Sequence, residues 1–151
     1  MKVIFLIFLM LTGFFNFAQD KTVYSLLEKG NLELLEKKIE ELRLEKSIKS
    51  TAYQGALIAK KASKLKKPKQ KLNVFKEGVR LLEESIKKEE SNLEYLFLRY
   101  IIQVKSPKFL SYNENIVEDK KRIEEGRISK TLKKLIVDFN LKNESFKLAI
   151  N

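Results

Sequence analysis

The sequence predicts an all-α protein of about seven short antiparallel helices. Apolar residues recur at steps of three and four almost throughout, and the sustained period-two alternation of a half-buried strand does not occur. The chain contains only five glycines and two prolines and has no Gly/Ser-rich or Pro-rich linker, which favours a single domain. It has no cysteine, so packing must hold the fold without disulfides. A closed bundle and a curved stack of hairpins both fit this pattern.

The first 18 residues are predicted to be a cleavable secretory signal. Lys2 provides a positive start, residues 3–15 are almost entirely apolar, and Ala18 is a small residue before a polar break. A helix over the apolar stretch would rise roughly 20 Å, less than a hydrocarbon core of about 30 Å. The alternatives are an uncleaved anchor and a buried N-terminal helix. We expect export to the periplasm or the medium, with no stable membrane span after cleavage.

The first three helices are predicted from caps and apolar spacing. The first ends at Gly30, a residue type that often terminates helices. Asn31 can cap the second helix. Either Ser47 or Ser50 can begin the third, which is expected to reach about Lys66. The second helix has one apolar face and the third a face of mostly small residues, respectively Leu32, Leu35, Ile39 and Leu42, and Ala52, Tyr53, Ala56, Ala59 and Ala62.

The fourth and fifth helices carry the strongest patterns. Pro68 breaks the chain within a lysine-rich turn before the fourth helix. The inward face of that helix is expected to consist of Leu72, Phe75, Val79, Leu82 and Ile86. Ser91 and Glu94 match a capping box that opens a fifth helix at Asn92. The fifth helix is apolar nearly all round, which predicts that it is the most buried one.

Two more helices complete the expected domain, residues 19–139. Residues 113–125 are predicted to form the sixth helix and residues 129–139 the seventh. The apolar residues expected to point inward from the sixth are Ile116, Val117 and Ile123. Residues 140–151 are expected to be a frayed tail.

The connection after the fifth helix contains three apolar or aromatic residues, Phe109, Leu110 and Tyr112. We expect them to plug the core beneath the turn. The alternative is an aromatic patch left open for a partner.

Gly78, Leu82 and Ser85 place small, large and small residues along one helix, and residues 93–103 supply the next apolar helix. In this pattern residues 53–104 resemble tetratricopeptide-type helical hairpins. The chain departs from that family because a polar run replaces the proline before a new repeat and no 34-residue period can be laid over it. The resemblance implies a TPR-like stack of hairpins.

A second resemblance rests on the sequence of residues 92–99, Gln103, residues 107–112 and residues 116–120. This stretch is similar to one in small exported, uncharacterised helical proteins of Bacteroidetes-type bacteria. The similarity implies a periplasmic or envelope setting and brings no activity with it.

The chain has a formal net charge of +11, and lysines supply most of its basic residues. Because arginine is the usual choice for bidentate contacts to phosphates and bases, a nucleic-acid partner is not expected. One basic run contains no acidic residue: Lys60, Lys61, Lys64, Lys66, Lys67, Lys69 and Lys71. This run suits a salt-sensitive contact with the phosphates of lipids or envelope polysaccharide. The alternative is a solvated helix end and turn.

Arg99 lies inside the most apolar helix, where a buried charge needs a partner. We expect it to pair with Glu94 or Asp119 and to fix how the helices dock. The alternative is that Arg99 and Gln103, one turn later, contact an anionic ligand.

The chain has no histidine and no cysteine, which excludes Ser-His-Asp and Cys-His catalysis and the usual zinc, haem and iron–sulfur ligands. Its five glycines form no phosphate-binding loop. A carboxylate pair remains possible, but many acidic residues are interpreted as solvated surface, among them Glu36, Glu40, Glu41, Glu83 and Glu84.

We therefore expect no metal, no cofactor and no enzymatic activity. The predicted function is that of an exported binding or scaffold protein that acts on a protein or an anionic envelope component. A small envelope hydrolase with a carboxylate pair is the alternative, and an exported toxin or immunity-like protein is a third.

Overall fold

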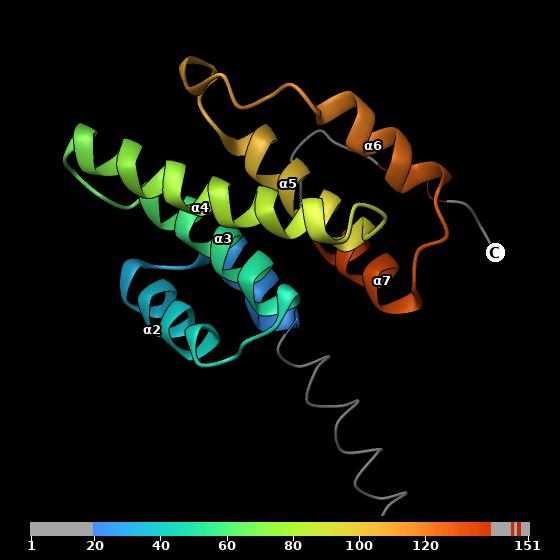
Figure 1. Cartoon of the computed structure of the whole chain (residues 1–151), viewed down its shortest axis with the longest axis horizontal. Helices are drawn as coiled ribbons and strands as arrows, with labels where there is room; N and C mark the ends of the chain where they lie inside the picture. Colours follow the sequence, from blue (N-terminus) through green and yellow to red (C-terminus); the bar gives the residue numbers. More distant parts are fainter. Residues whose placement is uncertain (1–19, 140–145, 147, 149–151) are drawn as a thin grey trace, which may run out of the picture.

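The computed structural model describes residues 20–139, 146 and 148, so the predicted signal and most of the predicted tail lie outside the described residues. All regular secondary structure in this part of the chain is helical, which confirms the predicted fold class. None of the helices described is long and apolar enough to cross a membrane. A helical segment at residues 20–29 precedes the elements labelled in Figure 1. These are α2 (Leu32–Arg43), α3 (Ile48–Ala62), α4 (Pro68–Lys88), α5 (Leu93–Lys105), the 3₁₀ turn η1 (Lys108–Leu110), α6 (Ile116–Glu125) and α7 (Lys130–Asp138).

The helices α3 and α4 form an antiparallel pair with very close backbones (Figure 1). A Cβ atom added to Gly55 would lie 2.6 Å from the backbone nitrogen of Leu82, and one added to Gly78 would collide with the backbone of Ala59. Both glycines are therefore required by the approach of two backbones, not by a turn. The small face predicted for the third helix is buried and makes this approach possible.

The helix α5 is the central element, as its apolar sequence predicts. Every residue from Tyr95 to Gln103 is buried. Aromatic rings around Phe97 join it to other parts of the chain, with Tyr24 stacked at 5.7 Å and Phe139 edge-on at 6.1 Å. Phe146 also packs edge-on against Phe97, at 5.6 Å, and Leu148 packs on the core. At these two positions the predicted frayed tail packs against the core instead, because the ring of Phe146 lies against Phe97 and Tyr100.

Two predicted helix caps are confirmed. The side chains of Asn31 and Ser47 each accept a hydrogen bond from a backbone N–H in the first turn of α2 and α3. Ser129, which was predicted only as the first residue of the seventh helix, caps α7 in the same way. The cap of α5 is wrong by one residue: Asn92, not Ser91, accepts from the backbone N–H of Glu94. Asn can cap as well as Ser, so the sequence alone does not decide between adjacent candidates.

Two predicted boundaries are wrong. The helix α3 ends at Ala62, not Lys66, and Pro68 is the first residue of α4. Proline suits this position because a backbone N–H in the first turn of a helix has no intrahelical acceptor, so its absence costs no hydrogen bond. The helix α6 begins at Ile116 instead of residue 113.

Three residues of the predicted apolar helix faces are exposed, for geometric reasons. Leu32 is 36% exposed and is the first residue of α2. Leu72 is 38% exposed. The antiparallel register places the end of α3 near Phe75, so Leu72 lies beyond its partner helix. Val117 is 82% exposed because Asp119 and Ile123, four residues apart, form the buried face of α6.

Candidate functional site

A buried ionic group joins α4, α5 and α6, and we name it the Arg99 cluster: Glu83, Arg99, Tyr112 and Asp119. The guanidinium of Arg99 donates to both carboxylate oxygens of Asp119, from Nε at 2.8 Å and from Nη2 at 2.7 Å. Its Nη1 donates to Oε2 of Glu83 at 3.0 Å, and the hydroxyl of Tyr112 donates to Oε1 of the same carboxylate. Arg99 is 8% exposed and Asp119 fully buried, so these contacts are largely shielded from water.

The charges of the Arg99 cluster stabilise one another. Burial opposes the charge of Arg99, but its hydrogen bonds to Asp119 and the nearby carboxylate of Glu83 outweigh burial and raise its pKa above the usual range. Burial raises the pKa of the Asp119 carboxyl, and Arg99 partly offsets this effect. Burial and the neighbouring Glu83 raise the pKa of Tyr112, which keeps the phenol protonated as a donor. Both carboxylates and the guanidinium are satisfied within the protein, an arrangement that docks helices.

The predicted pairing of Arg99 with Asp119 is confirmed, and the alternative pairing with Glu94 is wrong. Glu83 was interpreted as solvated surface, which is also wrong, because α4 turns this side chain towards Arg99. Gln103 does not join the guanidinium. Its Nε2 donates to Oδ1 of Asn115 at 3.2 Å, and its buried Oε1 has no partner in the described part of the chain.

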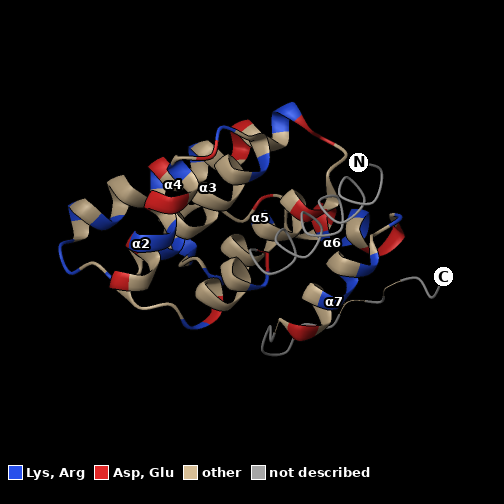
Figure 2. Cartoon of the chain, turned by 90° about the horizontal axis from the view of Figure 1, so that it is seen from below, with Lys and Arg blue, Asp and Glu red and all other residues tan. Residues whose placement is uncertain are grey.

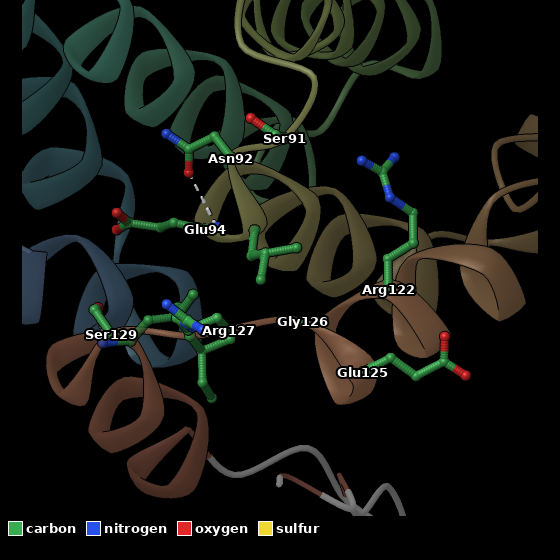
Figure 3. Close-up of a pocket in the computed structure, with 11 residues that line it drawn as sticks. Ser91, Asn92, Glu94, Arg122, Glu125, Gly126, Arg127 and Ser129 are labelled. Atoms are coloured by element: carbon green, nitrogen blue, oxygen red, sulfur yellow. Dashed lines mark hydrogen bonds between the residues drawn. The ribbon is translucent and has the colours of Figure 1, made fainter. Parts of the chain in front are cut away.

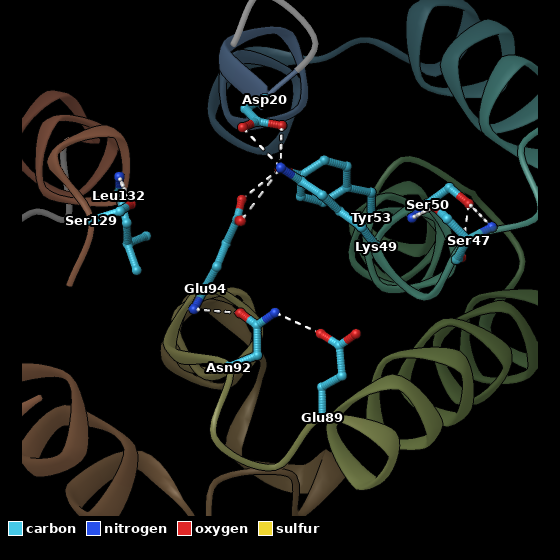
Figure 4. Close-up of polar contacts among 10 residues, drawn as sticks. All are labelled: Asp20, Ser47, Lys49, Ser50, Tyr53, Glu89, Asn92, Glu94, Ser129 and Leu132. Carbon is cyan, nitrogen blue, oxygen red and sulfur yellow. Dashed lines mark hydrogen bonds and ion pairs between the residues drawn. The ribbon is translucent and has the colours of Figure 1, made fainter. Parts of the chain in front are cut away.

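A second polar group, which the sequence did not predict, joins the segment at residues 20–29, α3 and α5, and we name it the Tyr53 cluster: Asp20, Lys49, Tyr53 and Glu94 (Figure 4). The Nζ atom of Lys49 lies 2.8 Å from Oδ1 of Asp20 and 3.6 Å from Oε2 of Glu94. The hydroxyl oxygen of Tyr53 lies 2.7 Å from Oδ1 of Asp20 and 2.5 Å from Oε1 of Glu94. One phenol therefore bridges two carboxyl groups.

The bridging phenol of Tyr53 has one proton for two carboxyl groups. Burial and the nearby Glu94 raise the pKa of Tyr53 above its usual range, so its single proton stays on the phenol. That proton can serve only one of the two carboxyl groups. Burial raises the pKa of Glu94, although Lys49 and Tyr53 act against it. If Glu94 is protonated, it can donate to Tyr53, which in turn donates to Asp20, and all three groups are then satisfied.

Glu94 also lines an open groove of about 590 Å³ between the start of α5 and the connection from α6 to α7 (Figure 3). The other polar groups along it include Arg122, Arg127 and Ser129. Arg122 donates to the backbone carbonyl of Glu90 at 2.6 Å. Glycosidase carboxyls flank a substrate bond with space between them. Asp20 and Glu94 instead converge on one phenol oxygen, so this pair does not provide that geometry.

The predicted lysine run lies around the α3–α4 connection, and we name it the lysine-rich end. Its members lie in the last turn of α3, in the connection and in the first turn of α4, where Figure 2 shows the blue of basic residues. Lys61 pairs with Glu36 at 2.9 Å. No acidic side chain among the described residues pairs with the five exposed members, Lys64, Lys66, Lys67, Lys69 and Lys71.

The positive charges at the lysine-rich end repel one another. Burial lowers the pKa of Lys60, and the positive charges of Lys105 and Lys64 lower it further. The last lysine of α5 thus adds to this end. Lys67 is the N-cap of α4 but makes no capping hydrogen bond, and the first turn contains no acidic residue. Positive charge is unfavourable at a helix N-terminus, so these lysines do not stabilise the fold.

The connection after α5 differs from the prediction at one residue. Leu110 and Tyr112 pack against the core as expected, and the ring of Tyr112 meets Phe75 edge-on at 5.8 Å. Phe109 is 83% exposed and therefore does not plug the core. Only one side of the short 3₁₀ turn faces the protein, and Leu110 occupies it.

No family model matches the chain, and no curated protein or solved structure shows significant similarity to it. The described residues contain no group of three or more acidic side chains that could hold a metal ion.

Proposed function

We propose that this is an exported, non-catalytic binding protein that attaches through its lysine-rich end to a phosphate-bearing component of the cell envelope. The export part rests on residues 1–18, whose sequence has the pattern of a secretory signal. The binding part rests on the arrangement of lysines around the α3–α4 connection.

A single observation carries the binding proposal: lysines gather around the α3–α4 connection, and those at the start of α4 do not stabilise the fold. Those in the first turn of α4 oppose the helix dipole. Lys60, Lys64 and Lys105 lie close enough for their charges to repel. An anionic partner would relieve both effects, and a surface rich in phosphates matches several exposed lysines at once.

The test neutralises three of these lysines, Lys64→Gln, Lys67→Gln and Lys69→Gln, in one variant. The protein is purified from envelope extracts so that all variants carry the same N-terminus. Binding is measured at low and high salt to vesicles of phosphatidylcholine and phosphatidylglycerol, and to a phosphorylated polysaccharide freed of lipid. With about 1 kcal/mol per lysine near an anionic surface, the triple variant should bind about a hundredfold more weakly at low salt.

The matched control removes the same charge elsewhere, at Lys87, Lys88 and Lys121, all of which are exposed. It should lose much less affinity. The melting temperature of the first variant should change little, because Lys67 and Lys69 oppose the dipole of α4 while Lys64, just beyond the end of α3, favours the dipole of that helix. Equal losses in both triple variants, or no salt-sensitive binding by the unmodified protein, would refute the proposal.

A further inference from the structure

Phe109 is held out in solvent by an ordered turn. It is 83% exposed and lies in η1, between Pro107 and Ser111. The backbone N–H of Leu110 donates to the carbonyl of Pro107, and that of Ser111 donates to the carbonyl of Lys108, each at 3.0 Å. Ser111 closes the turn in the left-handed conformation, with φ of 50°, which few residues other than glycine adopt.

The residues around Phe109 fix its outward position. Leu110 packs on the core, and Tyr112 contacts both the ring of Phe75 and the carboxylate of Glu83. The chain is therefore anchored directly after Phe109. The preceding helix, α5, is the most buried in the protein. An exposed aromatic ring on such a supported turn can meet a partner without first ordering a loop.

The turn also lies beside positive charge. Residues 105–112 contain two lysines and no acidic residue. One of them, Lys108, is exposed next to Phe109, and the other, Lys105, ends α5 and is close enough to Lys60 to lower its pKa. In Figure 1 the α3–α4 connection lies at the left and η1 at the upper left of the molecule. Lys105, four residues before Phe109, links the turn to the lysine run.

We propose that the phosphate-bearing partner is a lipid bilayer and that Phe109 inserts into its interface while the surrounding lysines contact anionic headgroups. The inference rests on the proposed function, because the lysines supply the attraction. An apolar ring gains free energy in the interface of a bilayer but not on a hydrated polysaccharide. A weak apolar anchor beside a basic patch gives reversible attachment, since stable anchoring generally needs two such signals.

The test compares Phe109→Ala with Val137→Ala, an exposed apolar residue on α7. Both are measured on the vesicles and the lipid-free polysaccharide described above. Phe109→Ala should bind phosphatidylglycerol vesicles about tenfold more weakly, as expected for an aromatic ring that is only partly buried. Its binding to the polysaccharide and its melting temperature should be unchanged. Val137→Ala should match the unmodified protein in all three measurements.

The absence of tryptophan allows a direct probe of insertion. Phe109→Trp should restore vesicle binding, and its emission should shift to the blue and be quenched by bromine-labelled lipid. Val137→Trp should show neither change.

The outcomes separate the two proposals. If Phe109→Ala binds vesicles normally and the emission of Phe109→Trp does not shift, the bilayer inference is wrong, while a loss of binding in the lysine variant still supports the proposed function. If Phe109→Ala also weakens binding to the polysaccharide, the ring contacts something other than lipid and the inference is overturned. If the unmodified protein binds neither surface, both proposals fail.

Discussion

The two buried polar clusters have the same composition and different architecture. Each contains one cation, two carboxyl groups and one tyrosine. In the Arg99 cluster, three nitrogens of one guanidinium reach both carboxylates, and Tyr112 bonds to only one of them. In the Tyr53 cluster, Lys49 lies 2.8 Å from Asp20 and 3.6 Å from Glu94, and Tyr53 bridges the two acids.

The difference follows from the chemistry of the two cations. Arginine presents a planar fork of donors that can satisfy two carboxylates in fixed directions, whereas the lysine ammonium is a compact point charge that prefers water. The side chain of Lys49 accordingly remains 36% exposed, against 9% for Arg99. Where the cation does not hold both acids closely, the phenol of Tyr53 bridges them.

The largest expected effect comes from Arg99→Leu, which removes the centre of the Arg99 cluster. It leaves Asp119 buried without a counter-charge and Glu83 with only the hydroxyl of Tyr112. Breaking a buried ion pair on one side costs about 3–5 kcal/mol. We expect a clear fall in melting temperature, measured by circular dichroism.

Two further variants sharpen this result. Arg80→Leu removes an arginine that pairs with Glu84 on the surface, and it should cost less than about 1 kcal/mol. The melting temperature of Arg99→Lys should fall between those of the other two variants, because a lysine keeps the charge but cannot donate to both carboxylates as the guanidinium does. An unchanged melting temperature for Arg99→Leu, together with lost binding to a partner, would show that Arg99 is a ligand contact instead.

A smaller effect is expected from Tyr53→Phe, which removes the bridge in the Tyr53 cluster. Asp20 and Glu94 would then face each other without the shared hydroxyl, at a cost of about 1–3 kcal/mol in the free energy of unfolding. The control is Tyr24→Phe, because the buried hydroxyl of Tyr24 has no hydrogen-bond partner in the described part of the chain. Equal denaturation midpoints for the two variants would mean that the bridge contributes nothing.

The smallest effect concerns pH and tests whether Glu94 carries a proton. Its pKa is raised in the folded state by burial, so its contribution to stability is greatest below its unfolded pKa and is lost as pH rises through the folded value. Glu94→Gln supplies a neutral donor at every pH. We expect this variant to be more stable than the unmodified protein at pH 7 by ~1 kcal/mol, with the gap closing towards pH 4.

Urea denaturation of both proteins across this pH range provides the measurement. If the gap is constant, or if the variant is less stable at pH 7, Glu94 is ionised in the folded protein and the proton bridge is wrong.

Features that depend on neighbouring residues were predicted well. The helical class, the caps at Asn31 and Ser47 and the burial of α5 follow from spacing of three or four residues and from local hydrogen bonds. The pairing of Arg99 with Asp119 was predicted because a charge in an apolar helix requires a counter-charge. The third member, Glu83, was missed because it comes from a helix whose rotation the sequence does not specify.

The Tyr53 cluster shows the limit of the sequence most clearly. Its four residues come from the segment at residues 20–29, from α3 and from the first turn of α5. No spacing rule connects Asp20 with Glu94, because the two residues lie far apart in the sequence. Only the packing of three segments brings the two acids to one phenol.

The sequence by itself determined an all-α chain with one apolar central helix, a lysine run without acids and an arginine that needed a partner. These properties are local, because they depend on residue type and on helical periodicity. The tertiary structure alone decided which acids meet at Tyr53, that Lys105 joins the lysine-rich end and that Phe109 faces solvent. Such properties depend on how helices are rotated and placed against one another, which only the packing of the whole domain sets.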